Sequence, residues 1–238
     1  MPRREHLAPA VRAAVDAVLR EPARGRAVAF DADGTLWRGD IGEELLRYLA
    51  CEGRLPALRG RRGIYEEYER RVAVDPAGAY AWSVEVMAGI PARELEALCV
   101  ELFQRRFEGR LFAYARPLVA ELCAHGLEVW IVSASPLWPV QAGARALGVD
   151  EDRVIAVRCG LDEAGCLTGE VETPVPCGEG KVHHLRARGI RPALAFGNGE
   201  LDLPMLAWAE RAVVLAPPDA DNALTRAAAE RNWPIQRC

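Results

Sequence analysis

The distribution of hydrophobic residues predicts that strands and helices alternate along most of the chain. The apolar run at 27–31 is typical of a strand buried on both faces of a parallel sheet. Further strands are expected at 128–132, 153–157, 193–196 and 212–215. Helical spacing of apolar residues predicts helices at 117–124, 138–147, 180–188 and 202–209. This alternation predicts an α/β fold, a Rossmann-like parallel sheet with right-handed crossovers.

The chain is expected to divide into three parts. An amphipathic helix at 9–22 belongs to an N-terminal segment, 1–25, packed on the core. No convincing strand occurs between 41 and 110, where helices recur, most clearly at 92–107. We therefore expect a core of residues 26–40 and 111–238, with a hairpin near 162–165, and an inserted helical cap at 41–110.

Composition limits the partners and the compartment. The 238 residues are 50% hydrophobic and 27% charged, as in globular proteins, and the net charge of −4 does not suggest nucleic acid or an anionic membrane as a partner. No segment reaches the roughly 18 apolar residues of a membrane span, and no signal peptide is evident. Seven cysteines without a secretory signal indicate free thiols. We expect a cytoplasmic monomer or homodimer.

Two carboxylates follow the first predicted strand directly. Asp31 and Asp33 lie where the chain leaves the sheet, and Gly34 permits a sharp turn close to a ligand. Carboxylates held this close repel each other, and a divalent cation would offset the repulsion. An acidic pair around Mg²⁺ suits phosphoryl transfer. The alternative is an Asx turn that only closes the strand.

Other strand ends also carry polar groups, and ligands bind outside the carboxyl ends of strands in such a sheet. The stretch 133–135 offers hydroxyl groups and turn amides for phosphate oxygens, and 197–202 is a polar and acidic turn. Lys181 opens a helix after a glycine-containing run. The simpler alternatives are a capping hydroxyl at Ser133, a solvated surface Lys181 and a helix N-cap at Asp202. The order of these groups favours one shared site.

These segments resemble the haloacid dehalogenase superfamily of phosphatases, in the branch similar to phosphoserine phosphatase. The first motif matches Asp31–Thr35, and the second, an apolar strand ending in serine, matches Val129–Ser133. The basic third motif matches Lys181, and the fourth matches Gly197–Asp202. The helical cap of the family corresponds to 41–110, and the resemblance covers nearly everything after residue 25.

The resemblance implies a Mg²⁺-dependent phosphatase that acts on a small phosphomonoester through an aspartyl-phosphate. Asp31 would attack phosphorus, and Asp33 would protonate the leaving oxygen and then deprotonate water. Mg²⁺ would bind the Asp31 carboxylate, the Asp33 backbone carbonyl and Asn198, with Asp202 acting through a bound water. The groups implied to hold the phosphoryl oxygens are Ser133, Ala134, Lys181 and the backbone amides of Gly34 and Thr35.

Asn198 departs from the family pattern, which usually has an aspartate there. An amide oxygen can coordinate Mg²⁺ but brings no charge. We expect weaker metal affinity, with Glu200 as a further candidate ligand. The alternative is a catalytically silent protein that binds a phosphorylated ligand.

An acidic residue suggests the substrate class. Asp40 follows Asp31 by nine residues, where similar phosphatases have an acidic residue that meets a substrate ammonium. Aromatic faces beside a carboxylate suit an amine, as in phosphoserine, phosphoethanolamine or phosphocholine. Asp40 could equally cap the helix that begins near residue 41. The candidate aromatic residues, which could instead simply pack the interior, are Trp37, Tyr48, Trp82 and Trp138.

Other enzyme classes fit less well. A P-loop requires serine or threonine after its lysine, but Val182 follows Lys181, and no dinucleotide-binding glycine motif follows a strand. A dehalogenase of the same superfamily would not need the acid and base that Asp33 provides.

Overall fold

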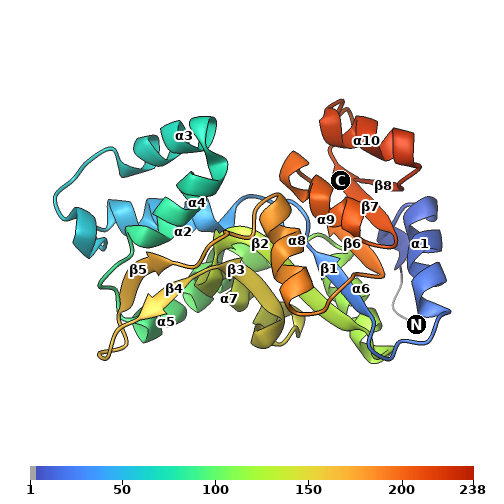
Figure 1. Cartoon of the computed structure of the whole chain (residues 1–238), viewed down its shortest axis with the longest axis horizontal. Coiled ribbons are helices and arrows are strands. Elements are labelled where there is room, and N and C mark those ends of the chain that lie inside the picture. Colours follow the sequence, from blue (N-terminus) through green and yellow to red (C-terminus); the bar gives the residue numbers. More distant parts are fainter. Residues whose placement is uncertain (1–3) are drawn as a thin grey trace.

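The computed structural model describes residues 4–238, so residues 1–3 of the expected N-terminal segment lie outside the described residues. A six-stranded sheet forms the centre, in the order β3-β2-β1-β6-β7-β8, with every neighbouring pair parallel (Figure 1). Its strands are β1 (Ala27–Phe30), β2 (Glu128–Pro136), β3 (Val154–Val157), β6 (Leu194–Gly197), β7 (Ala212–Ala216) and β8 (Ile235–Arg237). The prediction of a parallel α/β core is confirmed.

The apolar run of β1 is buried on both faces of this sheet. Val28 and Phe30 pack on one face and Ala29 on the other, all without exposed surface. Burying a valine or phenylalanine side chain contributes about 1.5–3 kcal/mol to stability, so these residues strongly favour a central position. Phe30 also stacks on Phe196 of β6, with the ring centroids 4.4 Å apart.

Helices cover both faces of the sheet. One face is packed by α1 (Pro9–Leu19), α6 (Ala115–Ala124) and α7 (Leu137–Leu147). The other is packed by α8 (Glu179–Ala187), α9 (Leu203–Trp208) and α10 (Ala223–Arg231). Neither α10 nor β8 was expected from the sequence, because Leu224 is the only large apolar residue in α10 and β8 has only three residues.

Between β1 and β2 the described chain is helical, apart from isolated bridges. Its helices are α2 (Ile41–Cys51), α3 (Ile64–Val74), α4 (Pro76–Glu85) and α5 (Ala92–Leu102). They lie beside the hairpin of β4 (Cys159–Leu161) and β5 (Leu167–Val171) (Figure 1). The amides of Gly89 and Ala92 donate to carbonyls of this hairpin at 2.8 and 3.0 Å. The hairpin therefore attaches the helical segment to the core.

Within the described part of the chain, no helix is both long and apolar enough to cross a membrane. The cysteines are free thiols, as expected. Cys99 of α5 is fully buried, whereas Cys123 of α6 is only half-buried.

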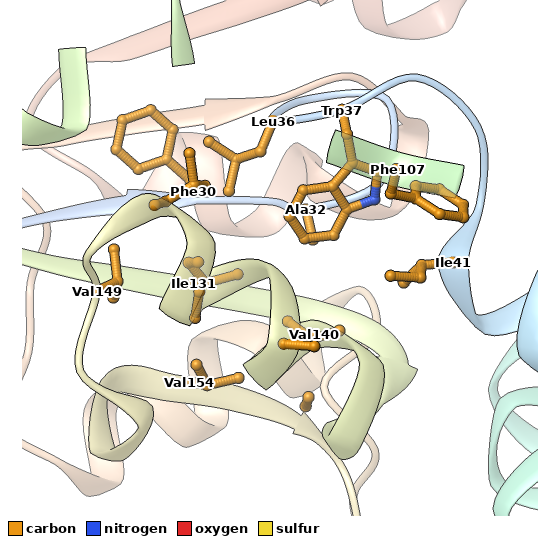
Figure 2. Close-up of a cluster of buried hydrophobic side chains, with 14 of the residues drawn as sticks. Phe30, Ala32, Leu36, Trp37, Ile41, Phe107, Ile131, Val140, Val149 and Val154 are labelled. Atoms are coloured by element: carbon orange, nitrogen blue, oxygen red, sulfur yellow. The ribbon is translucent and has the colours of Figure 1, made fainter. Parts of the chain in front are cut away.

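Trp37 lies in the buried cluster behind the carboxyl end of β1, and Figure 2 shows Ile41 and Phe107 beside it. Its indole has no exposed surface and meets Phe103 and Phe107 edge-on, with centroids 5.5 and 6.5 Å away. These phenylalanines lie in a π-helical turn, Phe103–Phe107, where the helix expected at 92–107 departs from regular α geometry after Leu102. A Cβ atom on Gly143 of α7 would lie 2.6 Å from the indole. Glycine is therefore required for this close approach.

Candidate functional site

Polar side chains from three adjacent strands meet at the carboxyl edge of the sheet. Asp31 directly follows β1, Ser133 lies within β2, and Asn198 directly follows β6. These residues line a cavity of about 140 Å³, together with Asp33, Asp40, Ala134, Lys181 and Asp202. The register of the pairing between β2 and β3 shifts between Val132 and Pro136. The residues between them therefore do not pair regularly with β3. Eight of the residues expected from the sequence thus lie around one cavity.

Lys181 provides the buried positive charge of this cavity and is 2% exposed. Its ammonium donates to Asp31 Oδ1 at 2.7 Å, to Asp202 Oδ1 at 2.6 Å and to the Val132 carbonyl at 2.8 Å. These bonds use all three of its donors. Burial disfavours the charged form, but the two carboxylates outweigh it and raise the pKa of Lys181. The alternative of a solvated surface lysine is wrong, and charge compensation of Asp31 fits this geometry.

Asp202 joins the turn after β6 to that ammonium. Its Oδ2 accepts from the amides of Asn198 and Gly199 at 2.9 and 3.0 Å, while Oδ1 accepts from Lys181. Asp202 is the residue before α9, but its side chain makes no capping hydrogen bond to that helix. Oδ2 therefore positions the Asn198 turn while Oδ1 binds Lys181, and a water-mediated metal contact by Asp202 stays a prediction.

Asp31 is held through both oxygens. Oδ1 accepts from Lys181, and Oδ2 accepts from the Thr35 hydroxyl at 3.1 Å. Burial, with the charge of Asp202 adding to it, raises the pKa of Asp31 to about 7, although Lys181 opposes the shift. A carboxylate of this kind has an oriented oxygen and is poorly solvated, which suits a nucleophile.

Asp33 is bound from two sides. Its Oδ1 accepts from the indole N–H of Trp37 at 2.7 Å and from the backbone amide of Ile41 at 2.8 Å. Its Oδ2 accepts from the Ser135 hydroxyl at 2.6 Å. Burial, with the charge of Asp40 adding to it, raises the pKa of Asp33 well above the usual value. A carboxyl group of this kind can carry a proton near neutral pH, as a general acid must.

Asn198 completes a set of converging oxygen positions. One terminal atom of its amide lies 3.0 Å from Asp31 Oδ2 and 3.0 Å from the Asp33 backbone carbonyl oxygen. Neighbouring ligands of an octahedral ion with bonds of about 2.1 Å are about 3.0 Å apart, so these atoms fit Mg²⁺ if the amide presents oxygen. If it presents nitrogen, the same atom donates to both oxygens. No cluster of three histidine, cysteine, aspartate or glutamate ligands occurs in residues 4–238, so an amide and a backbone carbonyl complete this set.

The expected phosphate contacts of Gly34 and Thr35 need correction. The Gly34 amide donates to the Trp37 carbonyl at 2.8 Å, and the Thr35 amide donates to the Ala32 carbonyl at 3.1 Å. The tight turn therefore uses both amides. Thr35 instead contributes its fully buried hydroxyl, which meets Asp31 and lies 3.2 Å from Asn198 Oδ1.

Asp40 has two roles in the geometry. Its Oδ1 accepts from the Glu43 amide at 2.8 Å and caps α2, as the simpler alternative proposed, yet it also lines the cavity. Burial raises the pKa of Asp40 to about 6. The aromatic wall of the cavity is Tyr80 of α4. None of the four aromatic residues expected from the sequence lines this cavity, and Trp82 is buried in the core cluster instead.

Sequence reasoning missed Tyr80 and the contact of Ser135 with Asp33. No periodicity marks Tyr80, because Pro76–Glu85 is apolar on most sides. One available signal would have strengthened Lys181: it is the only lysine among 30 basic residues. A planar guanidinium cannot direct three donors as a compact ammonium does, so a chain that otherwise uses arginine needs lysine at this position.

Comparison with known proteins shows what the chain resembles. A family model described as haloacid dehalogenase-like hydrolase matches residues 28–207. The chain is 28% identical over 225 residues to the phosphoserine phosphatase SerB1 of Mycobacterium tuberculosis, covering 88% of this chain and 70% of that protein. It is 27% identical over 145 residues to the phosphorylcholine phosphatase of Pseudomonas aeruginosa, covering 47% of this chain and 42% of that protein.

A solved structure is similar in fold. An apo-form phosphoserine phosphatase superposes with a TM-score of 0.59 at 22% identity, over 89% of this chain and 94% of the other. The two proteins thus share an overall fold.

Replacing Lys181 by methionine tests the buried charge cluster. Two buried carboxylates would lose their cation, so Lys181→Met should lower the free energy of unfolding by about 3–5 kcal/mol. Asp31→Asn in the Lys181→Met background should recover part of the loss, because one uncompensated charge is removed. Urea unfolding with chelator present measures both effects. Arg105→Met, at an exposed ion pair, is the control, and equal stability of Lys181→Met and wild type would contradict the cluster's role.

Proposed function

The chain belongs to the haloacid dehalogenase-like hydrolase family, and on that premise we propose that it hydrolyses a small phosphomonoester with Asp31 as the nucleophile. The observation that carries this proposal is the geometry of Asp31. One oxygen of this carboxylate meets the ammonium of Lys181, and the other faces Asn198 and Thr35 beside a small polar cavity. The names of two relatives, a phosphoserine and a phosphorylcholine phosphatase, support a phosphate ester as the substrate.

Two carboxyl groups divide the chemistry. Attack by Asp31 on phosphorus forms an aspartyl-phosphate, while Asp33 gives a proton to the departing ester oxygen. Asp33 then takes a proton from the water that hydrolyses the aspartyl-phosphate. The raised pKa of Asp33 supports this role, because an ionised group could not supply the first proton. Ser133 and Ala134 line the cavity where the phosphoryl oxygens would lie.

Mg²⁺ is the proposed cofactor. The Asp31 carboxylate, the Asp33 carbonyl and the Asn198 amide would hold it, since their spacing fits the edges of an octahedral site. When bound, it supplies positive charge that offsets repulsion between the nucleophile and an anionic phosphate.

A substrate panel tests the proposed reaction. Phosphate release from phosphoserine, phosphoethanolamine, phosphocholine, sugar phosphates and an aryl phosphate should depend on Mg²⁺ and stop with chelator. Asp31→Asn should lower kcat by at least about 10³-fold, because an amide is a poor nucleophile for phosphorus. Wild type that binds phosphate esters and releases no phosphate from any of them would overturn the proposal and favour a catalytically silent binding protein.

Replacing Asn198 by aspartate tests the metal site without an activity assay. Without metal, the added carboxylate would face Asp31 Oδ2 at about the same separation as the amide, so Asn198→Asp should unfold at lower temperature than wild type in chelator. With Mg²⁺ the variant should gain more stability than wild type, by about 1.4 kcal/mol for each tenfold gain in affinity. Thermal unfolding across a Mg²⁺ titration gives both values. Equal gains in the two proteins would argue against Asn198 as a ligand.

An amine-bearing ester is the proposed substrate class. The cavity contains Asp31, Asp33, Asp40 and Asp202, and Lys181 is the only cationic residue among those that line it. Even with Asp33 protonated and Mg²⁺ bound, a dianionic phosphate would give the cavity a net negative charge. An ammonium group on the substrate would offset that charge. Tyr80 and Asp40 provide an aromatic face and a carboxylate for such a group. Tyr80 comes from residues 41–110, and we propose that this helical segment acts as a substrate-selecting cap.

Asp40→Asn separates substrate recognition from folding. Asparagine caps helices as well as aspartate does, so the bond to the Glu43 amide should persist and stability should change little. The variant should raise KM for an amine-bearing ester about tenfold and leave KM for glycerol phosphate nearly unchanged. Steady-state kinetics on the two esters measure the contrast. Equal effects on both would rule out recognition of the ammonium by Asp40.

A further inference from the structure

Asp33 is bound differently at its two oxygens, and this asymmetry determines where its proton can lie. Oδ1 accepts from Trp37 Nε1 at 2.7 Å and from the Ile41 amide at 2.8 Å. Both partners are N–H groups, which donate and cannot accept. A proton on Oδ1 would therefore face two hydrogens, so protonated Asp33 must carry its proton on Oδ2.

Ser135 is the partner of Oδ2. Its hydroxyl lies 2.6 Å from that oxygen, and both residues line the cavity. A hydroxyl group can donate to a carboxylate or accept from a carboxylic acid. Ser135 can therefore stay bonded to Asp33 before and after proton transfer, on the side of the cavity where a substrate would lie.

Close packing holds Trp37 and Ser135, which bind the two oxygens of Asp33, in place. Trp37 is fully buried, with the rings of Phe103 and Phe107 against its edges and Gly143 leaving room for its indole. A Cβ atom on Gly42 of α2 would lie 2.8 Å from Ser135 Oγ. The start of α2 therefore packs closely against Ser135, next to the Ile41 amide that donates to Asp33.

We propose that Trp37 is a positioning residue that keeps the acidic proton of Asp33 on Oδ2, facing the substrate. This inference rests on the proposed phosphatase function. In the first step the phosphorus–oxygen ester bond breaks as a bond from Asp31 to phosphorus forms. The Oδ2 proton passes to the ester oxygen, which leaves as an alcohol. In the second step a water oxygen attacks phosphorus while Oδ2 takes a proton from that water. The bond between phosphorus and Asp31 breaks.

Leaving-group dependence tests the role of Trp37. Trp37→Phe keeps an aromatic ring but removes the N–H donor to Asp33. An alkyl ester needs protonation of its leaving oxygen far more than a nitrophenyl ester does, because an alkoxide is the poorer leaving group. The variant should therefore lose about tenfold in kcat on an alkyl phosphate, a fraction of the usual gain from acid catalysis, and less than about twofold on nitrophenyl phosphate.

Phe107→Leu is the matched control, since it disturbs the packing around Trp37 and retains the indole donor. It should lower both activities equally, if at all. An equal loss of the two activities in Trp37→Phe would overturn the proposal, because a merely structural defect acts on both esters.

The indole N–H resonance of Trp37 gives a readout that does not require turnover. Its signal, assigned by its absence in Trp37→Phe, should shift upfield in Asp33→Ala as the hydrogen bond to Asp33 Oδ1 is lost. An unchanged signal would overturn the positioning role. Wild type without activity on either ester would refute the proposed reaction, and the resonance would still decide whether Trp37 holds Asp33.

Discussion

The ammonium of Lys181 is the interaction on which the site depends. It draws together the end of β1 through Asp31, the backbone of β2 through Val132 and the turn after β6 through Asp202. Without this charge, two carboxylates would share a buried space. An uncompensated buried charge lowers the free energy of unfolding by several kcal/mol, a large part of the net stability of a domain. The same contact therefore stabilises the edge of the sheet and orients Asp31.

A second arrangement follows from this one. Because Asp202 is occupied by Lys181 and by the amides of its own turn, it acts as the scaffold that presents Asn198. The Asn198 amide lies against Asp31 and the Asp33 carbonyl, and it can offer either oxygen or nitrogen to them. An aspartate there would repel Asp31 when no cation is bound, whereas asparagine can donate to Asp31 Oδ2 without one. This provides a physical reason for accepting an uncharged residue at this position.

Patterns along the sequence predicted the fold because burial leaves a local record. The run at 27–31 has no polar residue before Asp31, so only a strand with two covered faces suits it. The residues around the cavity were expected because parallel strands end at one edge. Contacts between distant segments leave no such record. Tyr80 reaches the cavity through the packing of α4, and Trp37 reaches Asp33 because the turn after β1 folds back on itself. The amides of Gly34 and Thr35 were misjudged because the closed turn uses them.

The central claim is that phosphate passes through the carboxylate of Asp31. The most direct test is a rapid acid quench of the protein during turnover, followed by mass spectrometry of the digested protein. In the proposed reaction Asp31 keeps both of its own oxygens, because water attacks phosphorus and the oxygen of that water leaves with the phosphate. The protein quenched during turnover should carry a phosphoryl group on the peptide containing Asp31, and the protein recovered after the substrate is consumed should carry none. Phosphate release at the full rate with no phosphorylated Asp31 peptide in the quenched protein would contradict the account. That result would indicate direct attack of water on the substrate.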